Sequence, residues 1–379
     1  MAKTTAKKTP TQQTRNIQEL LSYCNTKFGA GAVMKGRHAI VDVDAFPTGV
    51  ITIDRAFGCG GVPLGRIMEL YGTESSGKTT TTLRFIAACQ RHFFKKKNRQ
   101  GVAAFVDAEH SLDPEWASKN GVNMEELIIS QPDSGEDALN IVETLVKSNQ
   151  VDLIIVDSVA ALVPQKELEG EVGDHHMGAQ ARMMSQGLRK LKGVASHAQA
   201  TVIFINQVHE KVGVVFGNPE VTPGGKALKY YATIRAQISR KDIIKDGDLS
   251  VGITTSIKMV KNKAAAPFAT GEYQICFGKP ARPVFGIDGA AALLTVAEEL
   301  NVISRKGSSY RFGDAILGNG VANTLAFLRK NAEVYDKIEQ QTYDKVFHFV
   351  DENTEKPSRS VDNVLDELEQ SGFIESDED

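Results

Sequence analysis

Short apolar runs alternate with amphipathic stretches of helical spacing between residues 45 and 282. We expect the apolar runs to be strands, and they cover residues 67–70, 102–106, 127–129, 153–156 and 202–205. Alternation of buried strands with helices is typical of βαβ units, in which helices cover both faces of a sheet. The pattern therefore predicts an α/β fold with a central, mostly parallel sheet.

Helical patterns also lie on both sides of this region. Residues 16–34 carry apolar positions at helical spacing after a basic leader, and three similar patterns cover residues 290–300, 319–331 and 334–346. The N-terminal helix could pack on its own core or dock on another subunit, and the pattern favours neither. We expect four parts: an N-terminal leader and helix (1–45), a core (46–282), a small α/β C-terminal domain (283–350) and an acidic disordered tail (351–379).

The composition, with 41% hydrophobic and 24% charged residues, is that of a soluble protein. No apolar run reaches the ~20 residues that a membrane-spanning helix needs, and the N-terminus lacks the apolar stretch of a secretory signal. We therefore expect a cytoplasmic protein without a membrane partner. The four cysteines lie far apart without C-x-x-C spacing, which argues against a disulfide framework or a structural zinc site.

The net charge of −3 is unevenly distributed. Residues 361–379 contain eight acidic residues and no Lys or Arg, so the rest of the chain carries a net charge of +5. This pattern is compatible with a polyanionic partner that competes with the tail, although by itself such a tail is more typical of a solvated, disordered end. A second charged segment, the basic stretch 91–100, is more typical of a solvated loop than of a binding patch.

The most specific motif is a phosphate-binding loop. It matches the pattern G-x-x-x-x-G-K-S/T, lies between an expected strand and an expected helix, and consists of Gly72, Thr73, Glu74, Ser75, Ser76, Gly77, Lys78 and Thr79. Its glycines let backbone N–H groups face phosphate oxygens, and Lys78 reaches the outer phosphates. The motif indicates a ligand with β- and γ-phosphates, with Thr79 on Mg²⁺.

Three further strand ends supply polar candidates near this loop. The run at 153–156 is followed by Asp157, a carboxylate suited to Mg²⁺. Ser158 follows it and is no base, so we expect Glu109, after the run at 102–106, to activate water; its neighbours Asp107 and His110 could instead be capping or structural residues. Gln207, after the run at 202–205, can sense the γ-phosphate, and a long glycine-rich loop follows it.

Six long motifs occur in the order known from one family. They are YGTESSGKTT at 71–80, VDAEHSLDP at 106–114, VDSVAAL at 156–162, GAQARMMSQGLRKL at 178–191, FINQVHEKVGVVFGNP at 204–219 and VKNKAAAPF at 260–268. Through most of its length the chain resembles the bacterial RecA recombinases. The resemblance implies a RecA-type P-loop ATPase core and a DNA-dependent ATPase that forms a helical filament of its own copies on single-stranded DNA, pairs it with double-stranded DNA and exchanges strands.

The resemblance also assigns roles to residues. Glu109 activates water, Gln207 senses the γ-phosphate, and Lys261 and Lys263 reach across the subunit interface to the neighbour's phosphates. Nucleotide contacts extend from the phosphate-binding loop to Thr80, Asp113 and Trp116, with Trp116 in the place of a Tyr that stacks on adenine. Thr79 and Asp157 are the residues expected to hold Mg²⁺.

Two DNA loops are implied at about 169–178 and 208–225. Met177 and Val212 match residues that wedge between base triplets, and the positions that match DNA-backbone contacts are Arg182, Ser185, Arg189, Gly224 and Gly225. His209 and Lys226 depart from the family pattern, so the contacts of the second loop are less firmly implied. There are two alternatives. A ring-shaped ATPase such as a hexameric helicase is disfavoured by the V-K-N-K segment and the two loop motifs, whereas a DNA-bound scaffold that activates a self-cleaving repressor is compatible with recombinase activity.

Overall fold

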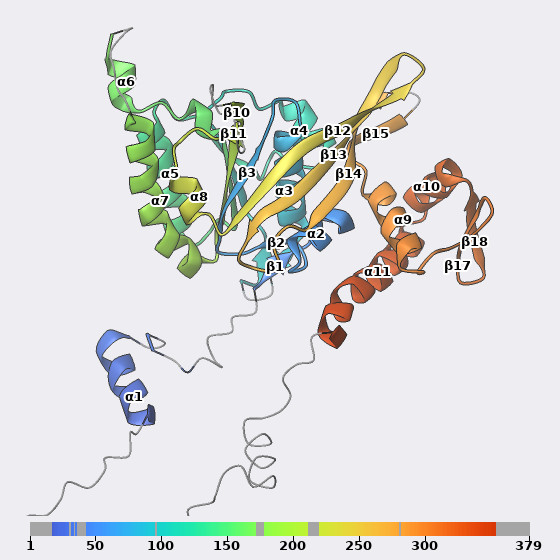
Figure 1. Cartoon of the computed structure of the whole chain (residues 1–379), viewed down its shortest axis with the longest axis horizontal. Helices are drawn as coiled ribbons and strands as arrows, with labels where there is room; N and C mark the ends of the chain where they lie inside the picture. Colours follow the sequence, from blue (N-terminus) through green and yellow to red (C-terminus); the bar gives the residue numbers. More distant parts are fainter. Residues whose placement is uncertain are drawn as a thin grey trace, which may run out of the picture. The chain divides into compact units, whose positions relative to one another are not determined.

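The computed structural model describes residues 17–29, 32–33, 35, 43–94, 97–171, 178–210, 220–279 and 282–353. The chain divides into two units, residues 1–43 and residues 44–379 (Figure 1). In the first unit, α1 (Ile17–Phe28) confirms the expected N-terminal helix. It ends earlier than expected, because Gly29 adopts a φ of +103°, a conformation common after the last turn of a helix. Its exposed apolar residues include Leu20 and Tyr23.

The second unit is built on a nine-stranded sheet with the order β15-β14-β13-β12-β3-β9-β8-β6-β7. The parallel part consists of β3 (Ile67–Gly72), β6 (Ala103–Asp107), β7 (Ile128–Ser130), β8 (Leu153–Asp157) and β9 (Thr201–Gln207), joined at one side by β12 (Ile234–Asp246). All five expected strands are therefore confirmed, with shifts of one or two residues at their ends.

An antiparallel half of the sheet was not expected. It consists of β12 and three strands paired after it, β13 (Leu249–Asn262), β14 (Thr270–Lys279) and β15 (Arg282–Ile287). In β12 buried and partly exposed residues alternate before the strand becomes exposed. Such mixed patterns give a weaker signal than the uninterrupted apolar runs of the parallel strands.

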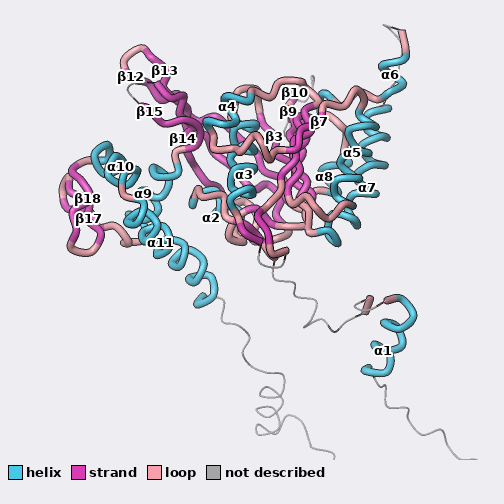
Figure 2. Tube along the Cα trace, turned by 180° about the vertical axis from the view of Figure 1, so that it is seen from behind, coloured by secondary structure: helices cyan, strands magenta, loops and turns pink. Residues whose placement is uncertain are grey.

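Helices lie on both sides of the parallel sheet (Figure 2), and a hydrophobic cluster packs on each of its faces. Alternate residues of β8 belong to different clusters, Leu153 and Ile155 to one, Ile154 and Val156 to the other, as expected from the two-residue period of a strand. The first cluster includes residues of α2 (Ile51–Phe57) and α3 (Lys78–Arg91), and the second includes residues of α5 (Gly135–Lys147), α7 (Ala179–Ala198) and α8 (Ala227–Tyr231). This arrangement holds the start of α3 next to the carboxyl ends of the strands.

Short elements complete the core. They are β1 (Ala45–Phe46) with β2 (Val62–Pro63), α4 (Pro114–Lys119), the short helix Val159–Ala161, α6 (Gln165–Glu169) and β10 (His209–Glu210) with β11 (Glu220–Val221). No helix within the described ranges combines the length and apolar character that a membrane crossing requires.

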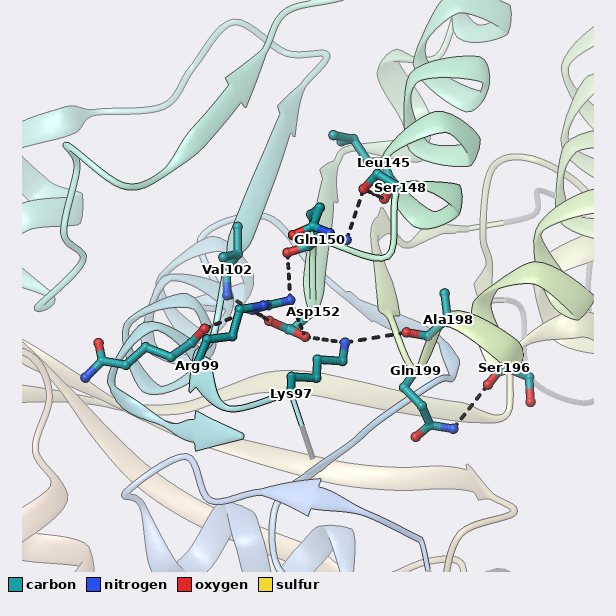
Figure 3. A network of polar contacts seen from close by, with 11 residues as sticks. Lys97, Arg99, Val102, Leu145, Ser148, Gln150, Asp152, Ser196, Ala198 and Gln199 are labelled. Atoms are coloured by element: carbon teal, nitrogen blue, oxygen red, sulfur yellow. Dashed lines mark hydrogen bonds and ion pairs between the residues drawn. The ribbon is translucent and has the colours of Figure 1, made fainter. Parts of the chain in front are cut away.

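The basic stretch forms a hairpin of β4 (Phe93–Phe94) and β5 (Arg99–Gln100). Lys97 and Arg99 both pair with Asp152, each at 2.6 Å, and the Asp152 side chain is fully buried (Figure 3). The expectation of a solvated loop is therefore wrong for these two residues. Their partner precedes β8, and sequence separation conceals the contact.

The C-terminal part contains α9 (Gly289–Glu299), α10 (Val321–Lys330) and α11 (Ala332–Asn353), which confirm the three expected helices. Between them lies an antiparallel sheet of β16 (Ser304–Lys306), β17 (Ser309–Phe312) and β18 (Ala315–Asn319). A third cluster fills this domain, with Leu293, Tyr310 and Ile338 among its buried members. The tail from residue 354 onward lies outside the described residues.

Candidate nucleotide and DNA site

The phosphate-binding loop joins the end of β3 to the start of α3. Gly77 has a φ of +93° at the N-terminal cap of α3, a conformation that residues with a side chain rarely adopt. A Cβ atom on Gly72 would lie 2.0 Å from the carbonyl oxygen of Ile238, and one on Gly77 would lie 2.4 Å from Cδ1 of Ile275. Gly72 is therefore required by the close approach of the β12 backbone, whereas Gly77 is required mainly by its positive φ, because the Cδ1 of Ile275 is the end of a side chain that can shift.

Lys78 begins α3 and turns back over the loop. Its Nζ donates hydrogen bonds to the carbonyl oxygens of Gly72 at 3.1 Å and Thr73 at 2.7 Å. Burial lowers the pKa of Lys78, and nearby carboxylates act in the opposite direction. The lysine and the positive N-terminal end of α3 therefore face the same loop, an arrangement that favours phosphate.

The structure brings Thr79 and Asp157 together. Thr79 Oγ1 donates to Asp157 Oδ2 at 2.8 Å. Burial raises the pKa of Asp157 to about 6, partly opposed by this hydrogen bond. Oxygen donors of this kind fit Mg²⁺, which usually keeps several waters and takes phosphate oxygens as further ligands. This fits a site with few protein ligands, since the part of the chain that the structure describes has no cluster of three or more His, Cys, Asp or Glu suited to a metal.

Glu109 and Gln207 also lie together at this edge of the sheet. The Glu109 backbone N–H donates to the carbonyl oxygen of Asp157 at 3.2 Å. Its Oε1 accepts from Ser158 Oγ and, at 3.5 Å, from Gln207 Nε2. The expected base and the expected sensor are therefore in reach of each other, although Gln207 is the last residue of β9 and does not follow the strand.

Asp107 has the structural role that the sequence left open. It is fully buried and accepts hydrogen bonds from the backbone N–H groups of Ser111 and Leu112 and from Gln131 Nε2. His110 adopts a φ of +53° in the same turn. Asp107 thus shapes the turn that carries Glu109.

The other residues expected to contact the nucleotide, Thr80, Asp113 and Trp116, lie at the starts of α3 and α4. Asp113 caps α4, because its Oδ1 accepts from the N–H groups of Glu115 and Trp116. The half-buried Trp116 donates from Nε1 to Thr80 Oγ1 at 3.2 Å. The indole is therefore held beside the first turn of α3, because its partner Thr80 lies two residues after Lys78.

Lys261 and Lys263 do not join this group. Thr255 of β13 lies next to the phosphate-binding loop, with its Oγ1 3.4 Å from the carbonyl oxygen of Ser76. Lys261 is six residues further along the same strand, a distance of about 20 Å at the usual strand rise. Its Nζ instead donates to the carbonyl oxygens of Lys229 at 2.8 Å and Tyr230 at 3.3 Å.

Of the residues expected to contact DNA, those that the structure describes lie in the first half of α7 or just before α8. Arg182, Ser185 and Arg189 share one face of α7, and both arginines are exposed. A Cβ atom on Gly224 would lie 2.9 Å from Val159 Cγ1, and one on Gly225 would lie 2.8 Å from Ala181 Cβ. The end of the second loop is therefore packed closely against α7. Met177 and Val212 lie outside the described residues.

A polar contact that the sequence motifs do not indicate joins the carboxyl end of β9 to the end of the second expected DNA loop. Asn206, buried in β9, donates from Nδ2 to Glu69 Oε1 at 2.9 Å and to the carbonyl oxygen of Pro223 at 3.1 Å. Asn206 directly precedes Gln207, and Pro223 directly precedes the Gly224–Gly225 pair. The one sequence feature that could have indicated a role for Asn206 is its position directly before the expected sensor Gln207.

The sheet, the phosphate-binding loop after β3 and the carboxylate at the end of β8 define a P-loop ATPase. A family model described as the RecA N-terminal domain matches residues 15–282, and one described as the RecA C-terminal domain matches residues 291–346. The chain is 48% identical over 331 residues to Protein RecA of Caldanaerobacter subterraneus subsp. tengcongensis, covering 87% of this chain and 93% of that relative. It is 49% identical over 316 residues to Protein RecA of Halalkalibacterium halodurans, covering 83% and 87%.

The chain therefore belongs to the RecA family, as the sequence motifs indicated. It is a DNA-dependent ATPase and a recombinase of homologous recombination and DNA repair.

Proposed function

We propose that ATP and Mg²⁺ bind at the phosphate-binding loop, and that each site is completed by Lys261 and Lys263 of a neighbouring copy in a filament. Lys78 and the N-terminal end of α3 hold the phosphates, and Thr79 and Asp157 hold the metal. Mg²⁺, when bound, neutralises charge on the phosphate oxygens. Trp116 offers an aromatic face to adenine beside Thr80.

In this mechanism Glu109 takes a proton from the attacking water, and Gln207 donates a hydrogen bond toward the γ-phosphate. Both side chains lie at the carboxyl ends of parallel strands, where ligands of such sheets bind. Gln207 is covalently joined to Asn206, which contacts the second DNA loop through Pro223. This connection supports a coupling of nucleotide state to DNA binding, in which ATP favours the DNA-binding filament and hydrolysis favours release.

The proposal that two subunits share each nucleotide site rests on the position of Lys261. A lysine side chain spans only a fraction of the roughly 20 Å along β13 between Lys261 and Thr255, the residue that lies beside the carbonyl oxygen of Ser76 in the same subunit's loop. A head-to-tail contact between copies, repeated along an open helix, brings this edge of one subunit to the nucleotide of the next. Such a lysine would act in trans, as an arginine finger does.

Mixed filaments test this arrangement. Glu109→Gln should inactivate the site of its own subunit, and the double change Lys261→Ala with Lys263→Ala should inactivate the site of a neighbour. In an equal mixture each site is intact with a chance of about one quarter, so DNA-dependent hydrolysis should recover to about a quarter of the unmodified rate. A mixture as inactive as its components would show that the lysines act within one subunit.

On the DNA side, Arg182, Ser185 and Arg189 contact the sugar-phosphate backbone, together with the Gly224–Gly225 turn. Met177 and Val212 separate base triplets. Backbone contacts give affinity without sequence preference, so homology is read by base pairing between single-stranded and double-stranded DNA. We place this activity in the cytoplasm and extend it to activation of a self-cleaving repressor on the same filament.

A further inference from the structure

Ser158 has a hydroxyl group that the proposed mechanism does not yet use. It follows Asp157 directly, is almost completely buried, and occupies the N-terminal cap of the short helix Val159–Ala161. A serine at such a position usually accepts a hydrogen bond from the backbone of its helix. Here its side chain makes no capping bond and instead donates to Glu109 Oε1.

The contacts of Glu109 are unevenly divided between its two carboxylate oxygens. Ser158 and Gln207 both donate to Oε1, while the backbone N–H of Glu109 is bound to the carbonyl oxygen of Asp157. None of the hydrogen bonds found among the described residues involves Oε2. The carboxylate is therefore fixed through one oxygen, and the other is left for a ligand.

We propose that Ser158 is a positioning residue that orients Glu109 so that Oε2 accepts the proton of the attacking water. This inference rests on the proposed role of Glu109 as the base. In the step, an O–H bond of water breaks and its proton moves to Oε2. The water oxygen bonds to the γ-phosphorus while the bond from that phosphorus to the bridging oxygen breaks, and its electron pair stays on ADP.

The expected effect is confined to the chemical step. A hydroxyl that holds the base should not change ATP binding, because the phosphates are held by Lys78 and the loop. Removing one hydrogen bond of about 1.4 kcal/mol corresponds to a tenfold loss of rate, so Ser158→Ala should lower kcat about tenfold with KM almost unchanged. Ser158→Thr keeps the hydroxyl and should restore much of the rate.

A matched control is Ser134, a buried serine that does cap its helix. Its hydroxyl oxygen accepts from the backbone N–H of Asp137 at 3.1 Å. Ser134→Ala should lower the melting temperature without lowering kcat. Since Ser158 makes no capping bond, Ser158→Ala should lower kcat and leave the melting temperature unchanged.

The experiment measures ATP hydrolysis at saturating single-stranded DNA for these variants, and for Ser158→Ala combined with Glu109→Gln. If Ser158 acts through Glu109, the double variant should hydrolyse ATP no more slowly than Glu109→Gln alone. An equal further loss in that background, a raised KM, or an unchanged kcat in Ser158→Ala would overturn the inference. Near-normal hydrolysis by Glu109→Gln alone would instead refute the proposed base, so the two failures are distinguishable.

Discussion

Asp152 carries a buried charge whose removal should strongly destabilise the core. Its side chain is fully buried, while those of Lys97 and Arg99 are 22% and 26% exposed. Asp152 Oδ2 also accepts from the backbone N–H of Val102 at 2.9 Å. One carboxylate thus joins the β4–β5 hairpin to the starts of β6 and β8 (Figure 3).

The loss in the free energy of unfolding caused by Asp152→Ala can be judged from the groups that lose their partner. Asp152→Ala leaves two cations without their partner and Val102 without an acceptor, and breaking a buried pair costs about 3–5 kcal/mol. Lys97 and Arg99 can partly turn toward water, so we expect a loss of about 3 kcal/mol, near the lower end of that range. Asp152→Asn keeps an oxygen acceptor for Val102 and should lose less.

Equilibrium urea unfolding, followed by circular dichroism in dilute protein, measures this loss. A matched control is the exposed pair of Arg55 and Glu299, whose side chains are 47% and 52% exposed. Glu299→Gln should cost less than about 1 kcal/mol, because exposed pairs contribute little. If Asp152→Ala were no more destabilising than Glu299→Gln, the cluster would not be holding the hairpin and the strands together.

Three further predictions concern other regions. Burial raises the pKa of Asp54 from 3.8 to about 7, so the protonated carboxyl favours the folded state. This part of the free energy of unfolding should be fully present below pH ~4 and be lost as the pH rises through 7. Urea unfolding across this range should show the decrease in the native protein and not in Asp54→Asn, which lacks the titrating group. Lys78→Ala should abolish ATP hydrolysis with an unchanged melting temperature, since the hydrogen bonds of its Nζ to described residues go to carbonyl oxygens of the loop; near-normal turnover would contradict the assignment of the phosphate site. Truncation after Ser360 shifts the net charge from −3 to +5 and should raise affinity for duplex DNA, most strongly at low salt; binding titrations that give equal affinities at low salt would mean that the tail does not compete with DNA.

Local motifs were sufficient to predict where the loop of the phosphate motif lies, between β3 and α3. Gly72, Gly77, Lys78 and Thr79 lie within one turn between a strand and a helix, so their spacing in sequence largely fixes their spacing in space. The sequence also predicted that Asp157 and Gln207 lie at one edge of the sheet, because parallel strands present their carboxyl ends there. For the same reason Glu109 was expected there, and the structure places it beside Gln207.

The sequence by itself determined the class of fold, the phosphate-binding loop and the family, because these depend on local patterns and long motifs. Only the tertiary structure decided which distant side chains meet. The hydroxyl of Ser158 and the carboxylate of Glu109 are 49 positions apart, and Arg99 and Asp152 are 53 apart. Contacts across such separations depend on strand order and on the packing of whole elements. No local pattern of residues encodes them, so the partners of Asp152 and the orientation of Glu109 emerge only when the sheet is assembled.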